Sequence, residues 1–168
     1  MHLAGRAKDL IIRGGHNIDP ATIEDALLAH PQITAASAVG RPDPHAGEVP
    51  VAYVTRAPGA TVTEQELQAW ALERVPERAA APKAVTVLDA LPVTAIGKPY
   101  KLALRADATR RAIAEALAPV DGADVDAVIE DGTVVATVTL PSEADTSTVA
   151  ATLRRYTVPS RLTYRGTP

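Results

Sequence analysis

The chain has 168 residues, enough for one domain and part of a second. Its formal net charge of −3 argues against a surface built mainly for nucleic acid, and no apolar run approaches the ~20 residues of a membrane span. The absence of cysteine excludes disulfides, thiolate catalysis and cysteine metal sites. We assign no metal site, and without a secretory signal pattern we expect a cytoplasmic location.

The first predicted element is a hairpin. Residues 9–13 form a β-type run that Gly14 and Gly15 close, because paired glycines adopt the positive φ angles of a tight turn at little cost. Asp19 and Pro20 follow as an N-cap and a proline in the first helical turn, so a helix is expected to begin there.

The next predicted elements are two strands and a second helix. The strands are expected over residues 33–39 and 49–55, with a polar loop over 41–48 between them. Thr63 and Glu66 have the spacing of a capping box, which predicts that the second helix begins after Thr63.

A third strand is predicted over residues 84–88, and the polar, Pro- and Gly-containing segment 91–101 is predicted to be irregular. A long helix is expected over 102–117. The residues that follow, 118–122, have the composition of a linker.

The remainder of the chain predicts a ββαβ unit. Two strands, 125–130 and 133–140, flank an Asp-Gly pair that favours a hairpin, and a helix over 147–156 and a strand over 161–164 follow. The same order of elements occurs in residues 33–88. This recurrence is equally consistent with a degenerate internal duplication and with chance.

Together these elements predict an α+β fold. We expect a small two-layer domain in which helices pack on a sheet of about three strands, with a hairpin at its N-terminus and the ββαβ unit appended. The predicted division places the first domain at residues 1–118 and a structural extension at 119–168.

The segment around Lys98 is the strongest candidate for chemistry. An ammonium group that follows a glycine outside regular structure can be brought to an oxyanion, although a lone Gly-Lys pair is usually a solvated surface lysine. It is not a nucleotide-binding Walker A loop, because the earlier glycine and the following Ser or Thr are missing.

Three segments in order carry a resemblance to a known family. They are GRAKDLIIRGGHNI at residues 5–18, the segment from Val39 to Val54 with its VGRPD, GE and AYV runs, and LPVTAIGKPYK at 91–101. They resemble successive motifs in the C-terminal domain of the adenylate-forming (ANL) superfamily, which includes the acyl-CoA synthetases. The resemblance covers residues 5–117.

The resemblance implies one part of an AMP-dependent carboxylate–CoA ligase, of the kind that acts in fatty acid metabolism. Such enzymes form an acyl-adenylate from a carboxylic acid and ATP with Mg²⁺, and then a thioester with CoA. The ATP site would belong mainly to a large N-terminal adenylation domain, so we expect this chain to be inactive without that partner. A fatty or alicyclic acid is the substrate that the resemblance favours.

Individual roles follow from matched motif positions. Lys98 matches the catalytic lysine that bridges the substrate carboxylate and the α-phosphate in the first step. Arg6 matches a residue that reaches the AMP ribose, and Lys8 matches the hinge whose backbone torsions absorb the domain rotation. Gly14 and Gly15 match the loop that enters the site for thioester formation, beside the CoA pantetheine channel.

The chain also departs from the family. Many members have an aromatic-lysine pair that helps to dock CoA where this sequence has Ala79 and Ala80. Lys101 is equally consistent with a second cation near the site and with a surface charge.

One alternative belongs to another functional class. The chain can be a non-catalytic interaction module, or a target whose Lys98 is acetylated by a lysine acetyltransferase, which would remove the charge and regulate the ligase.

Overall fold

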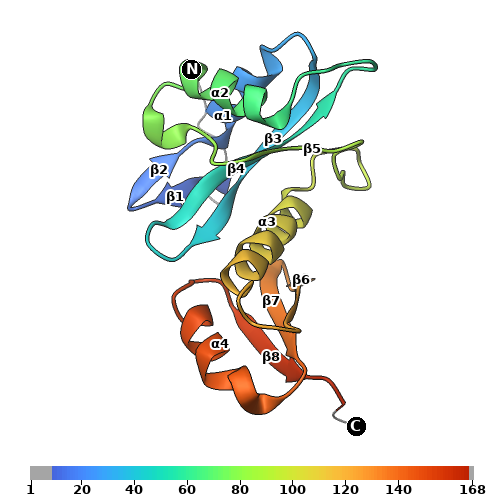
Figure 1. Cartoon of the computed structure of the whole chain (residues 1–168). Helices are drawn as coiled ribbons and strands as arrows, with labels where there is room; N and C mark the ends of the chain where they lie inside the picture. Colours follow the sequence, from blue (N-terminus) through green and yellow to red (C-terminus); the bar gives the residue numbers. More distant parts are fainter. Residues whose placement is uncertain (1–8, 167–168) are drawn as a thin grey trace.

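A computed structural model of the chain describes residues 9–166, which form an α+β fold with two sheets (Figure 1). The first sheet has five strands in the order β2-β1-β4-β3, with β5 also paired to β4, and the second has three in the order β6-β7-β8. The elements are, in chain order, β1 (Ile11–Arg13), β2 (His16–Ile18), α1 (Pro20–Leu28), β3 (Ile33–Asp43), β4 (Gly47–Arg56), α2 (Glu64–Arg74), the 3₁₀ turn η2 (Arg78–Ala80), β5 (Val85–Val87), α3 (Lys101–Ala116), β6 (Asp124–Glu130), β7 (Thr133–Leu140), the 3₁₀ turn η3 (Glu143–Asp145), α4 (Thr146–Leu153) and β8 (Ser160–Tyr164).

The N-terminal hairpin is part of the first sheet. Strands β1 and β2 are antiparallel, with Ile11 opposite Ile18, and β1 continues the sheet through the pairing of Arg13 with Gly47 in β4. The predicted α+β class is confirmed, and the hairpin together with the three predicted strands makes one five-stranded sheet.

The polar loop predicted over residues 41–48 is wrong, because most of it is strand. β3 extends to Asp43 and β4 begins at Gly47, so a short turn joins them. The Asp43 carboxylate closes this turn by accepting hydrogen bonds from the backbone N–H groups of His45 and Ala46, at 2.9 and 2.8 Å. The polar sequence reflects partial solvent exposure at the end of the sheet, which strand pairing tolerates.

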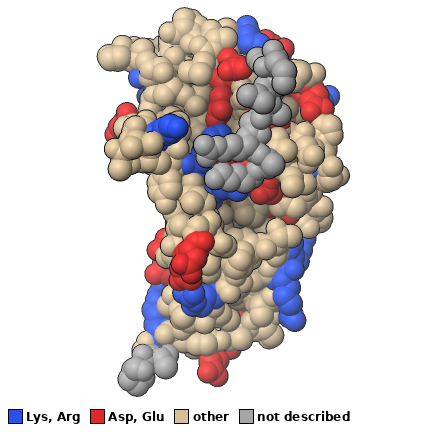
Figure 2. All heavy atoms as spheres, turned by 180° about the vertical axis from the view of Figure 1, so that it is seen from behind, with Lys and Arg blue, Asp and Glu red and all other residues tan. Residues whose placement is uncertain are grey.

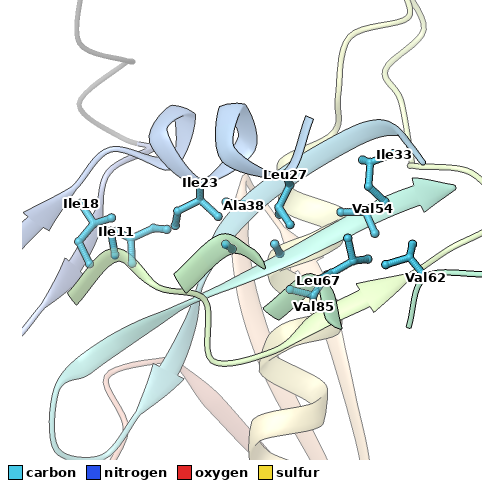
Figure 3. Packing of buried hydrophobic residues seen from close by; sticks show 13 residues of the cluster. Ile11, Ile18, Ile23, Leu27, Ile33, Ala38, Val54, Val62, Leu67 and Val85 are labelled. Carbon is cyan, nitrogen blue, oxygen red and sulfur yellow. The ribbon is translucent and has the colours of Figure 1, made fainter. Parts of the chain in front are cut away.

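The main core lies between the first sheet and helices α1 and α2 (Figure 3). Each helix starts at a predicted cap: the Asp19 side chain accepts from Ala21 N, and Thr63 and Glu66 form the complete capping box. Core residues from the strands include Ile11, Ile18, Ile33, Ala38, Val54 and Val85, and the helices contribute Ile23, Leu27, Leu67 and Ala71.

The opposite face of this sheet packs on α3. Val39, Val51 and Tyr53 from the strands contact Leu104 and Ala108 from the helix. The Tyr53 hydroxyl donates a 2.7 Å hydrogen bond to the Asp107 carboxylate, and burial together with this bond raises the pKa of Tyr53 above its ordinary value. The alternation of side chains along β3 and β4 therefore supplies both layers of the domain.

The second sheet packs on the other end of the same helix. Ile113 of α3 and Leu117, the residue that follows the helix, belong to the core that β7 and α4 complete, so α3 contributes to both cores (Figure 1). Strands β6 and β7 form the predicted hairpin, in which Asp131 and Gly132 have φ angles of 50° and 76°.

The appended unit has the connectivity of β3-β4-α2-β5. In each case the first two strands are antiparallel, and the strand after the helix lies parallel to the second. Ala52 N donates to Ala84 O at 3.0 Å, and the corresponding Ala136 N donates to Pro159 O at 2.9 Å. The predicted recurrence of elements is therefore also a recurrence of topology, while a common origin stays a hypothesis.

Candidate functional site

The segment between β5 and α3 folds as a narrow hairpin that presents Lys98. Tyr100 N donates to Pro92 O at 2.9 Å, and Thr94 N donates to Lys98 O at 2.7 Å. The turn is closed by a 2.9 Å hydrogen bond from Gly97 N to Thr94 O, and Gly97 has a φ of 80° that favours glycine. As predicted, the segment contains no helix or strand before Lys101, and the isolated bridge between Val93 and Pro99 together with these hydrogen bonds orders it.

The side chain of Lys98 is exposed, and its ammonium group has no hydrogen bond or ion pair with any residue within 9–166. Its backbone is held separately, because Lys98 N donates to Thr94 Oγ1 at 3.2 Å. An ammonium group on a fixed backbone can approach an anionic group and donate hydrogen bonds to it. Ile96 on the same turn is 78% exposed.

The Gly14–Gly15 turn is a second exposed feature with a fixed base. Both glycines have positive φ, 56° and 81°, and a Cβ added to either would meet no atom of the described residues within 4 Å. Gly14 N donates to Ala46 O at 2.7 Å, which anchors the turn to the end of the β3–β4 hairpin. The backbone of this turn is therefore open to an approaching ligand.

Two side chains that flank these glycines tie the hairpin to the segment before β5. The Arg13 guanidinium donates to Ala79 O at 2.9 Å, and His16 Nε2 lies 2.7 Å from the Glu77 carboxylate. His16 is thus a tethering residue of the loop. The pairings join residues more than 60 positions apart, so no local sequence signal predicts them.

Glu48 in β4 and Gly40 in β3 help to hold the same hairpin in place. Glu48 Oε2 accepts a 3.0 Å hydrogen bond from Ile12 N, one residue before Arg13 in β1. An added Cβ at Gly40 would lie 2.6 Å from the Glu48 carboxyl carbon, so glycine leaves room for this carboxylate. Glu48 therefore positions β1.

A cavity of about 720 Å³ lies beside the hairpin. It is lined by positive and neutral side chains and by no carboxylate among the residues that form it. The small side chains of Ala79 and Ala81 open this space next to the tether. The lining residues are Arg13, Gln65, Gln68, Ala69, Leu72, Arg78, Ala79, Ala81, Pro82 and Lys83.

The structure does not bring the predicted site residues together in one place. The turn between β1 and β2, which holds Gly14 and Gly15, and the segment between β5 and α3, which holds Lys98, lie on opposite sides of the first domain (Figure 1). Arg6 and Lys8 fall outside the described residues, so their predicted roles stay predictions.

Charge on the surface is distributed in small groups of both signs. Figure 2 shows acidic and basic side chains interspersed among neutral residues on the face seen from behind. Within residues 9–166 no cluster of three or more His, Asp and Glu side chains is arranged to hold a metal ion. None of the helices in this part of the chain is long and apolar enough to cross a membrane.

Comparison with known proteins assigns the fold and the lysine segment to a family. Residues 22–98 match the sequence model of the AMP-binding enzyme C-terminal domain. The chain carries a C-terminal domain of the adenylate-forming enzymes. The matched segment of this domain begins in α1 and ends at Lys98.

Two curated relatives show how much of a longer enzyme the domain represents. The chain is 48% identical over 119 residues to marinolic acid–CoA ligase from Pseudoalteromonas sp. (strain SANK 73390), which covers 71% of this chain and 18% of that ligase. It is 42% identical over 100 residues to feruloyl-CoA synthase from Amycolatopsis sp., covering 60% of this chain and 20% of that enzyme. The chain therefore spans about a fifth of the length of these relatives.

Solved structures agree with this placement. Apo MatB from Rhodopseudomonas palustris is similar with a TM-score of 0.58 and 36% identity, over 62% of this chain and 20% of that one. The amide bond synthetase McbA from Marinactinospora thermotolerans is similar with a TM-score of 0.57 and 36% identity, over 62% and 21% of the two chains.

Proposed function

We propose that this domain supplies the catalytic lysine and the thioester-forming loop of an ATP-dependent carboxylate–CoA ligase. The observation that carries the proposal is the placement of two exposed, backbone-anchored features on opposite sides of one domain (Figure 1). One is an unpaired ammonium group and the other is an open glycine turn. A domain with two such faces suits an enzyme that performs two steps and presents a different face in each.

Lys98 acts in the first step. A carboxylate oxygen of the acid attacks the α-phosphorus of ATP, the bond to the β-phosphate oxygen breaks, and pyrophosphate leaves while an acyl-adenylate forms. Both reactants are anionic, so the Lys98 ammonium lowers the barrier by donating hydrogen bonds to the carboxylate and the α-phosphate. Mg²⁺ bound with ATP, mainly at the large domain, would neutralise further phosphate charge.

The glycine turn acts in the second step. The CoA thiol loses its proton to solvent, its sulfur attacks the acyl carbonyl carbon as the thiolate, the bond to the phosphate oxygen breaks, and AMP leaves with the electron pair. Gly14 and Gly15 allow the pantetheine arm to pass close to the backbone, because neither has a Cβ. Since this turn and Lys98 lie on opposite sides, the domain must rotate between the steps, and Lys8 is the proposed hinge and Arg6 a proposed AMP contact.

The cavity beside the glycine turn is the proposed site for the phosphate groups of CoA. Arg78 and Lys83 line it and have exposed side chains, and no carboxylate opposes an anionic ligand there. We expect Arg78→Ala and Lys83→Ala each to raise the KM for CoA by about 3- to 30-fold, the effect of losing one charged hydrogen bond.

The matched control for these variants is Arg154→Ala, an exposed arginine after α4 that does not line the cavity. Initial rates at varied CoA check the expectation, with pyrophosphate release from ATP and acid measured alongside. An unchanged KM for CoA in both cavity variants would remove this site from the proposal.

The carboxylic acid substrate and the acceptor of the acyl group are selected mainly by parts of the enzyme outside this chain. Relatives include ligases named for marinolic and ferulic acids, and one similar structure is an amide bond synthetase. A thiol acceptor is favoured because the exposed glycine turn and the basic cavity together fit an extended, phosphate-bearing thiol.

The test combines this chain with its large adenylation domain, fused or in trans, and follows pyrophosphate release over a panel of fatty, alicyclic and aromatic acids. We expect release only when both parts are present, followed by thioester formation with CoA. Product formation with amines but not with CoA would replace the thiol by an amine acceptor, and no release with any acid would contradict the ligase proposal.

The exposure of Lys98 also supports a second role as an acetylation site that regulates the ligase. Acetylation would remove the positive charge of Lys98 and thereby prevent acyl-adenylate formation. Mass spectrometry after incubation with a lysine acetyltransferase checks this role, which predicts selective modification of Lys98. Equal modification of Lys83 and Lys98 would contradict it.

A further inference from the structure

A half-buried ion pair lies next to the Lys98 hairpin. Lys101 is the first residue of α3, and its Nζ donates to Glu24 Oε2 of α1 at 2.9 Å. The side chains of Lys101 and Glu24 are 22% and 19% exposed, so solvent and salt screen this pair less than an exposed one. The remaining ion pairs of residues 9–166 each have at least one partner that is more exposed.

This pair also binds the open edge of the first sheet. Lys101 Nζ donates to Ala38 O at 3.1 Å, and Ala38 N donates to Glu24 Oε2 at 2.9 Å. Ala38 lies in the edge strand β3 opposite Ala52, whose N–H points away from β3 toward Ala84. Ala38 therefore turns its own N–H and C=O outward, where an edge strand has no partner strand, and the ion pair satisfies both groups.

The pair also lies at the start of α3. Tyr100 precedes α3 as its N-cap residue and makes no side-chain capping bond. The start of α3 is instead held to β3 and α1 through Lys101. The Lys98 hairpin ends at Tyr100, directly before Lys101, so the ion pair attaches the C-terminal end of the hairpin to the domain. The N-terminal end of the hairpin follows Leu91, which packs against the core.

From this arrangement we infer that Glu24 and Lys101 are positioning residues for Lys98. Within residues 9–166 the Lys98 ammonium has no partner, so its location depends on the hairpin backbone and on the two ends by which the hairpin joins the domain. The inference rests on the proposed function of Lys98. Because the ion pair lies at the C-terminal end of the hairpin and not at its turn, it fixes the position of the hairpin without contacting the reactants.

The first experiment requires no enzymatic activity. Hydrogen exchange of the Gly97 and Tyr100 amides is compared in the wild-type chain, Lys101→Met and the double variant Lys101→Met/Glu24→Gln. The double variant leaves no unpaired buried charge, which keeps the test informative if the single variant folds poorly. We expect these amides to exchange about tenfold faster in both, as expected when a charged hydrogen bond is lost. Lys101→Arg retains the charge and should restore most of the protection.

Arg161→Met is the matched control, because it breaks the ion pair of Arg161 with Glu130 on the appended sheet, far along the chain from this hairpin. It should leave the exchange of both amides unchanged. Unchanged exchange in Lys101→Met and in the double variant would overturn the inference.

The second experiment uses the ligase assembled with its large domain. We expect the double variant to lower kcat for pyrophosphate release by about 10- to 100-fold, since displacing a reacting group by about 1 Å has effects of this size. The KM for ATP should change less than about twofold, and thioester formation from preformed acyl-adenylate should be retained. A merely structural defect would instead reduce both steps equally.

The two experiments separate the inference from the proposed function. Faster exchange with unchanged adenylation, in an enzyme that Lys98→Ala inactivates, overturns the positioning role. If Lys98→Ala itself leaves adenylation unchanged, the proposed function fails, while the exchange data still show whether the ion pair anchors the hairpin.

Discussion

At the scale of single residues, the domain is organised by side chains that reach backbone groups across long stretches of sequence. Arg13 binds Ala79 O, Glu48 binds Ile12 N, and Trp70 Nε1 donates to Ala26 O at 2.7 Å. Such bonds satisfy main-chain groups that sheet and helix leave open, and they fix exposed turns without burying them. The glycine turn and the lysine hairpin can therefore be exposed and yet well positioned.

Gly40 gives a direct test of this principle. We expect Gly40→Ala to lower the free energy of unfolding by about 1–2 kcal/mol, because the new Cβ displaces the Glu48 carboxylate and breaks its bond to Ile12 N. Urea unfolding measures the change. In a Glu48→Ala background the same substitution should have a much smaller effect, and equal effects in the two backgrounds would contradict this explanation.

At the scale of elements, local sequence predicts capped helix starts and tight turns more reliably than the ends of strands. The caps at Asp19 and Thr63 and the Asp-Gly hairpin turn are confirmed, because each depends on neighbouring residues alone. The extension of β3 to Asp43 was not predictable in this way, because strand length depends on pairing with β4.

The site shows the same division between local and long-range information. The positions of Lys98, Gly14 and Gly15 follow from sequence motifs. The contacts that hold them, such as those of Glu77 and Glu24, come from distant segments and appear only in the folded chain.

The turn between β3 and β4 makes a pH-dependent prediction. The backbone N–H groups of Ala46 and His45 hold the pKa of the Asp43 carboxyl below its ordinary value of 3.8. A carboxyl whose pKa is depressed by folding stabilises the protein above that ordinary value, and the contribution is lost as the pH falls through the folded-state pKa.

We therefore expect Asp43→Ala to lower the free energy of unfolding by about 1 kcal/mol at pH 7, in line with the loss of hydrogen bonds to a charged group. The difference from wild type should shrink as the pH falls below 3.8. Urea unfolding over a pH series checks this, with the exposed Asp121 of the linker changed to Ala as the control. A difference that stays constant down to acid pH would show that the carboxylate charge has no part in the turn.

At the scale of the whole molecule, α3 joins the two sheets into one structure. Leu104 lies in the core on the first sheet, and Ile113 lies in the core of the appended unit. A helix that both cores need cannot unfold with one and remain folded with the other, so the appended unit is expected to stabilise the domain that bears Lys98.

This shared helix predicts one cooperative unfolding transition. Leu104 and Ile113 are 2% and 0% exposed. We expect Leu104→Ala and Ile113→Ala each to lower the free energy of unfolding by about 2–5 kcal/mol and to shift the same transition in differential scanning calorimetry. Two transitions, each responding to one substitution alone, would contradict the coupling.

The role of Lys98 is tested by measuring the two half-reactions separately in Lys98→Ala, assembled with the large domain. Pyrophosphate release from ATP and acid reports the first step, and thioester formation from preformed acyl-adenylate and CoA reports the second. We expect that removing the ammonium lowers the first rate by about 100-fold or more, an effect typical of losing a group that stabilises transition-state charge, and spares the second. Equal loss of both rates, or no loss of the first, would contradict the assignment of Lys98 to acyl-adenylate formation.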